Sequence, residues 1–183
     1  GAKCVNAVSE WFEVEVSRGG QIHHMTFERG KTTKKLEVIG KAKDTGTLIT
    51  FKPDPLIFPS TDFSFDILSQ RLRELAFLNR GLRITIEDKR TGRSHEFHYP
   101  GGIVSFVEHL GTTKTPIHSD AVFIEGERES VAMEIAMQWN SGFSESIFTF
   151  ANAINTHEGG THEEGFRTAL TSVVNKFGED WGF

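Results

Sequence analysis

The stretch Asp44-Thr45-Gly46-Thr47-Leu48-Ile49-Thr50-Phe51-Lys52-Pro53-Asp54 organises the first half of the chain. Gly46 lies in a tight turn, where a residue without a Cβ adopts backbone conformations that other residues resist. The strand that follows alternates polar and apolar residues and ends at Pro53, which has no N–H to donate to a sheet. Thr47 places a hydroxyl at the start of this strand, and apolar Ile49 comes next on the same face. The pattern fits either an ordinary turn entering a strand or the edge of a small-molecule pocket.

Around this stretch, the spacing of apolar residues predicts an α+β chain. Residues 144–152 fit the period of either a strand or a helix, and residues 111–119 have the composition of a linker. The predicted elements are, in chain order, a helix at 1–11; strands at 12–17, 21–28, 36–40 and 47–52; a helix at 65–79; strands at 82–87 and 94–99; a helix at 103–110; strands at 120–126 and 131–139; and a helix at 163–177.

Glycines and short polar residues mark the ends of several of these elements. Gly19-Gly20 is typical of a hairpin turn, and Arg80-Gly81 is typical of a helix stop. Ser60-Thr61-Asp62 offers N-caps for the helix at 65–79. The expected apolar faces of the two longer helices are Ile67, Leu68, Leu72, Leu75 and Leu78 in the first, and Leu170, Val173, Val174 and Phe177 in the second.

Composition limits the class of protein. With 183 residues, the chain is long enough for one large domain or two small ones. A formal net charge of −5 argues against a module that coats DNA with its whole surface. The single cysteine, Cys4, excludes an intramolecular disulfide framework and fits a reducing cytoplasm. No run approaches the roughly 18 apolar residues of a membrane span, and no signal-peptide pattern is present.

The histidines do not form a recognisable metal motif. His157 and His162 are five residues apart, which rotates one about 140° from the other on a helix. We therefore predict no metal ligands here, and we interpret the adjacent His23 and His24 as surface strand residues. Thr161 with Glu164 is predicted to form a capping box, and the glycines before it leave an anion site at this helix start as an alternative.

Both ends of the chain suggest an internal segment of a longer polypeptide. A helix pattern is present from the first residues without an initiator Met or an N-cap, and the C-terminal helix pattern is followed only by Gly178-Glu179-Asp180-Trp181-Gly182-Phe183.

Several stretches together resemble the DNA gyrase B family of type II topoisomerases, in the GHKL ATPase superfamily. The resemblance covers essentially the whole chain. The matching runs are Val5-Asn6-Ala7-Val8-Ser9-Glu10-Trp11, Thr45-Gly46-Thr47, Arg71-Leu72-Arg73-Glu74-Leu75-Ala76-Phe77-Leu78-Asn79, Phe97-His98-Tyr99-Pro100-Gly101-Gly102 and Glu158-Gly159-Gly160-Thr161-His162.

The resemblance implies two domains. Residues 1–112 match the C-terminal part of a GHKL (Bergerat) α/β sandwich, and residues 113–183 match the start of a transducer domain with a ribosomal protein S5-like fold. Losing the front of the first sandwich would expose apolar surface and favour aggregation.

The resemblance also implies part of an ATP site. Gly1 matches the last glycine of the family's phosphate lid, and Ala2 matches the next pocket position. Thr47 matches a threonine that holds adenine through a shared water, and Ile49 matches an apolar wall beneath the base. Arg18 matches the arginine at the pocket rim where coumarin inhibitors stack, a role that suits a planar guanidinium.

Other functional residues of the family have no match in this chain. The general-base glutamate, the magnesium-binding asparagine and the adenine-binding aspartate lie upstream, and the transducer lysine that reaches the γ-phosphate lies downstream. We therefore expect no catalytic residue and no metal ligand in this segment, and no tight ATP binding or ATP hydrolysis by the segment alone.

For the full-length parent, the resemblance implies a topoisomerase that uses ATP and Mg2+. Its partners would be DNA, gyrase A, a second copy of gyrase B and coumarin-type inhibitors, in the cytoplasm and with no membrane. Arg128 and Arg167 are candidates to line a DNA cavity. The corresponding subunit of topoisomerase IV and a non-catalytic GHKL-like binding or assembly module remain the alternatives.

Overall fold

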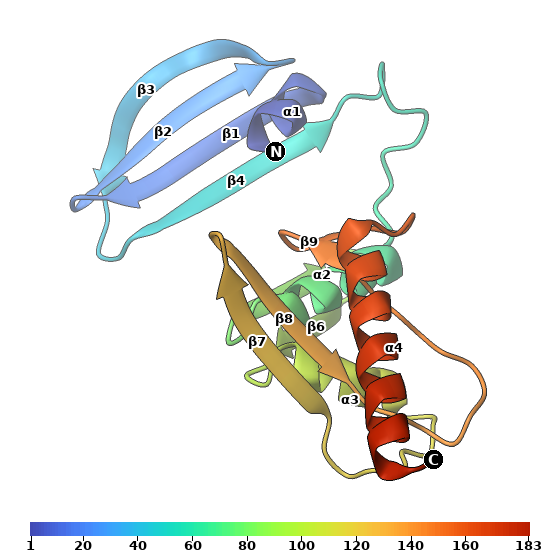
Figure 1. Ribbon diagram of the computed structural model, residues 1–183. Helices are drawn as coiled ribbons and strands as arrows, with labels where there is room; N and C mark the ends of the chain where they lie inside the picture. Colours follow the sequence, from blue (N-terminus) through green and yellow to red (C-terminus); the bar gives the residue numbers. More distant parts are fainter. The chain divides into compact units, whose positions relative to one another are not determined.

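The computed structural model describes residues 1–183 and divides into two compact units, Gly1–Phe63 and Ser64–Phe183 (Figure 1). Each unit combines helices with antiparallel strands, so the fold is α+β as predicted. None of the helices is both long enough and apolar enough to cross a membrane. The division lies elsewhere than the predicted domain boundary between residues 112 and 113, which stays a prediction about the domains of the family.

The first unit is a short helix followed by a four-stranded antiparallel sheet with the strand order β3-β2-β1-β4. Its elements are α1 (Ala2–Ala7), β1 (Ser9–Arg18), β2 (Gln21–Glu28), β3 (Lys31–Lys41) and β4 (Gly46–Pro53). The four strands predicted between residues 12 and 52 are confirmed, although β3 is much longer than the strand expected at 36–40. Pro53 ends β4, an edge strand, where the missing N–H is tolerated.

Positive φ angles make the hairpins of this sheet tight. Gly19 and Gly20 have φ angles of 61° and 76° between β1 and β2, as their glycine pair predicts. Arg29 and Gly30 repeat the pattern between β2 and β3, with φ angles of 47° and 78°. A Cβ on Gly30 would lie 3.3 Å from the Cα of Ala7, so this turn also needs glycine for space.

The first helix is shorter than the sequence predicts. α1 ends at Ala7, and Ser9 already pairs with Pro53 in the sheet. The Ser9 side chain is buried and donates a hydrogen bond from Oγ to the carbonyl of Val5 at 2.6 Å. Residues 9–11 therefore belong to strand β1, because sheet pairing outweighs the apolar spacing that alone fits a helix.

The second unit contains three longer helices and three strand pairs. Its elements are α2 (Phe65–Leu78), β5 (Arg83–Asp88), β6 (Arg93–His98), α3 (Ile103–Gly111), β7 (Val122–Arg128), β8 (Val131–Met137), β9 (Phe150–Ala151), β10 (Ile154–Asn155) and α4 (Thr161–Trp181). The strands predicted at 82–87 and 94–99 pair as β5 and β6, and those predicted at 120–126 and 131–139 pair as β7 and β8. Residues 144–152 are neither a full strand nor a helix, because only Phe150–Ala151 pair, with β10.

An aromatic stack forms the centre of the second unit. Phe77 is 1% exposed, and its ring stacks on Tyr99 and Phe106 with centroid distances of 3.7 and 5.0 Å. The other buried apolar residues are Phe65, Ala76, Phe97 and Phe106. This core differs from the predicted α2 face, since Ile67 is 71% exposed and Leu68 is 38% exposed.

Both helix caps predicted for this unit are wrong. Ser64, and not Ser60-Thr61-Asp62, caps α2 through an Oγ that accepts a hydrogen bond from the N–H of Ile67. α4 has Gly160 as its N-cap without a side-chain hydrogen bond, so Thr161 lies inside the helix and forms no capping box. Gly160 has extended φ and ψ angles of 165° and 170°, and the helix begins at Thr161, the residue that was predicted to be its N-cap.

The C-terminal helix leaves its apolar stripe open. Val173, Val174 and Phe177 are each more than half exposed, and α4 has no buried residue. The stripe predicted to be buried is therefore present as a pattern but is not covered. Glu163 and Glu164 occupy the first turn, where they complement the helix dipole.

Candidate functional site

Three of the five predicted site residues share one face of the first sheet. In the β1–β4 ladder, Thr47 lies opposite Val16 and Ile49 lies opposite Val14. Side chains alternate along a strand, so Arg18, two residues after Val16, faces the same side. Most of this face is apolar, and Thr47, Arg18 and His23 lie toward the hairpin end of the sheet.

The exposure of this face suits a binding surface. Ile49 is 44% exposed and Phe51 is 39% exposed, while Phe12, opposite Phe51 in the ladder, is 4% exposed. The ring of Phe12 packs against Phe51 and Phe27 with centroid distances of 6.3 and 6.1 Å. The apolar exposure expected from the sequence is therefore present on this sheet. A flat base or an aromatic inhibitor would cover apolar area here and gain free energy of transfer.

Gly1 and Ala2 lie at the start of α1. Both are exposed, and a Cβ built on Gly1 would meet nothing within 4 Å. Gly1 therefore adds no side chain at the start of α1, and its carbonyl accepts hydrogen bonds from the N–H groups of Cys4 and Val5. The structure shows Thr47, Ile49 and Arg18 on a common face and gives Gly1 and Ala2 no contact with them.

A cleft lies at the other end of the same face, beside α1. Its volume is about 320 Å3, and none of the five predicted site residues lines it. The lining residues are Val5, Val8, Ser9, Phe51, Pro53, Phe58, Ser60, Thr61, Asp62 and Phe63. Its walls are mostly apolar, so it extends the apolar face and adds no second set of reactive groups.

An ion pair between a buried aspartate and a half-exposed arginine, which the sequence did not predict, fixes the end of β4. Asp54 is 1% exposed, and its Oδ2 accepts a hydrogen bond from Nε of Arg29 at 2.6 Å. Its Oδ1 accepts the backbone N–H of Leu56 at 3.0 Å. The guanidinium of Arg29, aided by this backbone hydrogen bond, lowers the pKa of Asp54 below its ordinary value. The pair joins the β2–β3 turn to the segment that follows β4.

The signal for this pair was present in the sequence as Pro53-Asp54-Pro55. An aspartate between two prolines is a favourable place for a side chain that accepts the backbone N–H two residues on. The partner Arg29 could not be found in the same way, because it lies 25 residues away.

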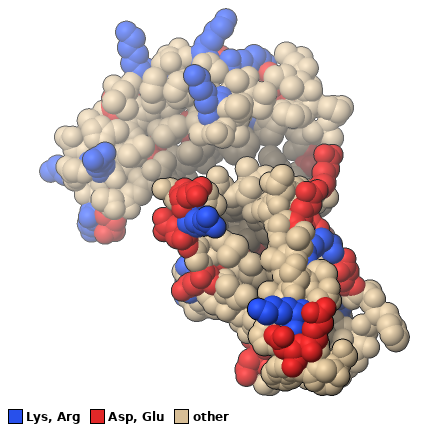
Figure 2. Space-filling model, viewed as in Figure 1, with Lys and Arg blue, Asp and Glu red and all other residues tan.

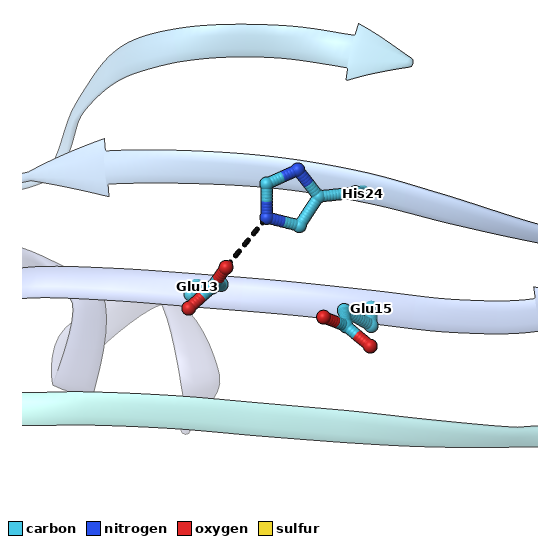
Figure 3. Close-up of side chains that lie close together, drawn as sticks. All are labelled: Glu13, Glu15 and His24. Atoms are coloured by element: carbon cyan, nitrogen blue, oxygen red, sulfur yellow. Dashed lines mark hydrogen bonds and ion pairs between the residues drawn. The ribbon is translucent and has the colours of Figure 1, made fainter. Parts of the chain in front are cut away.

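The opposite face of the sheet is polar and contains a buried histidine. His24 is 7% exposed, so the prediction that it is a surface residue is wrong, although His23 does face the other way. Nε2 of His24 lies 2.6 Å from Oε1 of Glu13, and this hydrogen bond raises the pKa of His24 against the opposing effect of burial. Glu15 lies directly opposite His24 in the ladder (Figure 3).

Comparison with known proteins places this fold and this pattern of residues in a family. A family model described as DNA gyrase B matches residues 102–183. The DNA gyrase B protein of Halalkalibacterium halodurans is 56% identical over 97% of this chain, which covers 28% of that protein. The DNA gyrase B protein of Bacillus mycoides is 51% identical over 97% of this chain, which covers 45% of that protein.

A solved structure extends the match to three dimensions. The 43K ATPase domain of Thermus thermophilus gyrase B, solved in complex with an aminocoumarin, superposes with a TM-score of 0.89 at 37% identity. The match covers 99% of this chain and 50% of that one. The chain belongs to the DNA gyrase B family. It spans between about a quarter and a half of the length of the relatives it matches.

The arginines predicted to line a DNA cavity lie in the second unit of this gyrase B family chain. Arg167 donates hydrogen bonds to Glu145 at 3.0 Å and to Glu163 at 2.9 Å, so its charge is compensated within the unit. Arg128 is exposed beside Glu129. Figure 2 shows acidic and basic side chains intermixed over the visible face of this unit, with no single basic patch.

Proposed function

We propose that this chain is part of the ATP-hydrolysing subunit of DNA gyrase, a type II topoisomerase that introduces negative supercoils into DNA. The match to the Thermus thermophilus ATPase domain over 99% of the chain carries this proposal. The placement of Thr47, Ile49 and Arg18 on one exposed sheet face supports it, because these are the positions where the family resemblance implies a nucleotide and coumarin site.

Each predicted site residue would act through a different property. Ile49 presents apolar area to the flat face of a base, and the hydroxyl of Thr47 holds its edge through water. Arg18 stacks its planar guanidinium on an aromatic inhibitor at the rim. Gly1 and Ala2 leave the backbone at the start of α1 open to the phosphates. ATP supplies the free energy of phosphoryl transfer when it is bound.

In the full-length protein, we propose ATP and Mg2+ as cofactors and a clamp as the mechanism. Two copies of gyrase B close around a DNA segment on nucleotide binding and reopen after hydrolysis, a population shift driven by differential nucleotide affinity. Gyrase A and DNA are the other partners, and the cytoplasm is the site of action. Residues 1–112 and 113–183 belong to the GHKL and transducer domains in this proposal.

Residues 1–183 alone are expected to be inactive as an ATPase. The family resemblance matches no residue here to the general base or to the magnesium ligand, so no group in the chain would activate water or hold Mg2+ for hydrolysis. Magnesium-dependent ATP hydrolysis by this purified chain, above the rate of a mock preparation, would contradict this expectation.

A binding titration tests the proposed site. An aminocoumarin and a non-hydrolysable ATP analogue are titrated calorimetrically into the chain and into Thr47→Ala, Arg18→Ala and Thr50→Ala. Thr50 is the matched control, because it lies on β4 opposite Glu13 and faces the other side of the sheet. We expect weak aminocoumarin binding that Thr47→Ala and Arg18→Ala each reduce by about tenfold, as the loss of one good polar contact predicts. Equal affinities for all three variants, or no binding by the folded chain, would contradict the site.

A further inference from the structure

Two carboxylates and a buried imidazole converge on the polar face of the first sheet. Glu13 and Glu15 extend from β1, and His24 extends from the neighbouring β2 (Figure 3). One side-chain oxygen of each glutamate and a ring nitrogen of the histidine all lie within 4.8 Å of one another. Each residue is held by a strand interior, so their relative positions are fixed by the sheet and not by a flexible loop.

No lysine or arginine lies directly opposite these carboxylates in the ladder. Glu13 lies between Thr26 and Thr50, and Glu15 lies between His24 and Leu48. A third carboxylate, Glu37 of β3, has its Oε1 3.5 Å from Nδ1 of His24. Three acidic groups therefore surround one imidazole, and a cation would offset their mutual repulsion.

The environment of His24 indicates which cation fits. Its side chain is 9% exposed, and its Nδ1 is buried without a hydrogen-bond partner. Nε2 points to Glu13, while Nδ1 points to the carboxylate of Glu37. Histidines that bind a metal through one ring nitrogen usually donate the other N–H to a carboxylate, which orients the ring. Oε1 of Glu37 lies 3.5 Å from Nδ1 without a hydrogen bond to it, so a small rotation of the Glu37 side chain would complete this arrangement.

We propose that Glu13, Glu15 and His24 bind a divalent transition-metal ion, with Zn2+ the best match, and that Glu37 orients His24. Imidazole with carboxylates suits Zn2+, whereas Mg2+ prefers oxygen ligands alone. Zinc binds carboxylate oxygen and imidazole nitrogen at about 2.0–2.2 Å, so a small rotation of the glutamate side chains closes the present separations. Water would occupy the remaining position, since the two glutamates are only half-buried.

The histidines at 157 and 162 contribute nothing to this site. They lie in the second unit, and Nε2 of His162 lies 3.2 Å from the hydroxyl of Thr156. The proposed ligands come from adjacent strands, where cross-strand neighbours and residues two apart share a face. A search for two histidines at helical spacing does not detect such a site.

The test is a calorimetric titration of Zn2+ into the whole chain, made in a Cys4→Ser background to remove the exposed thiol. The variants are Glu15→Gln, His24→Gln and Glu37→Gln, and the matched control is His23→Gln, the adjacent histidine on the other face. Mg2+ is titrated in parallel, and Co2+ provides visible absorption bands that report nitrogen and oxygen ligation. Far-UV circular dichroism of each variant shows whether the sheet is folded.

We expect one Zn2+ per chain, with affinity lowered at least about tenfold by Glu15→Gln and by His24→Gln, and about 10–100-fold by Glu37→Gln. His23→Gln should bind as the parent does, and Mg2+ should bind far more weakly. Glu15→Gln is decisive, because Glu15 has no hydrogen bond to His24 or Glu13 whose loss would unfold the sheet (Figure 3). Parent-like affinity in Glu15→Gln, an equal loss in His23→Gln, or no Zn2+ binding would overturn the proposal.

Discussion

Replacing Phe77 with alanine should destabilise the second unit more than any surface substitution. Phe77 is 1% exposed, stacks on Tyr99 and Phe106, and lies 5.6 Å from the ring of His109. Removing a fully buried phenylalanine costs about 3–5 kcal/mol, from lost burial and from the cavity that remains. A domain of this size has about 5–15 kcal/mol of stability in total, so the change removes a large share of it.

Urea unfolding followed by circular dichroism and tryptophan fluorescence measures this cost. With a slope of about 2 kcal/mol per molar urea, a loss of ~4 kcal/mol lowers the midpoint of the transition of this unit by about 2 M. Phe143→Ala is the matched control, because Phe143 is fully exposed and its loss should change stability by no more than about 0.5 kcal/mol.

A double-mutant cycle separates stacking from burial. If Phe77 and Phe106 support each other, the combined loss in Phe77→Ala/Phe106→Ala should differ from the sum of the single losses by about 0.5–3 kcal/mol. A Phe77→Ala midpoint equal to that of Phe143→Ala would refute the assignment of the core to this stack.

Three further predictions concern the first unit. Asp54→Asn should lower the stability of the folded state at neutral pH and make that stability depend less on pH. The pKa of Asp54 is depressed, so its ion pair with Arg29 stabilises the fold fully above the unfolded-state pKa of about 3.9, and this contribution is lost as the pH falls through the lower folded-state pKa. Thermal unfolding measured from pH 6 to 2 follows this loss. Gly30→Ala should destabilise the first unit by about 1 kcal/mol or more, because φ is +78° and the new Cβ would press on the backbone of Ala7. Urea unfolding measures this loss. Gly46→Ala is the control and should not show it, because a Cβ on Gly46 would meet open space. Ile49→Lys should reduce aggregation in light scattering, because it places a charge on the exposed apolar face at a side chain that is 44% exposed. Unchanged scattering would place the aggregating surface elsewhere.

Local patterns predicted most of the elements because their causes are local. Gly19-Gly20 requires only its own backbone freedom to make a hairpin, and Pro53 ends a strand through its own missing N–H. The same holds for the helix at Phe65–Leu78, whose C-terminal end differs from the prediction by a single residue. Resemblance to a family supplied the candidate site residues, since Thr47 or Arg18 alone has no distinctive spacing.

The missed features depend on residues that are distant in the sequence. Asp54 can be buried because Arg29 pairs with its carboxylate, and His24 can be buried because glutamates on the two neighbouring strands lie beside its ring nitrogens. The covered side of α2 was misjudged because Phe77 and Ala76 pack inward while Ile67 remains exposed, a choice that helical spacing alone does not make. Propensity identifies an amphipathic element, but tertiary packing decides which stripe is covered.

Both proposals for the first unit depend on one strand register. Along β1, Val14 and Val16 face the predicted nucleotide side, and the intervening Glu13 and Glu15 face the predicted zinc side. Because side chains alternate with a period of two, a slip of one residue would exchange the two faces and destroy both sites together. The β1–β2 hairpin and the Asp54–Arg29 pair hold this register from opposite ends of the sheet. If Glu15→Gln loses Zn2+ binding and keeps aminocoumarin binding, the substitution has therefore removed a metal ligand and left the strand register intact. If one folded variant loses both kinds of binding, its strand register has changed.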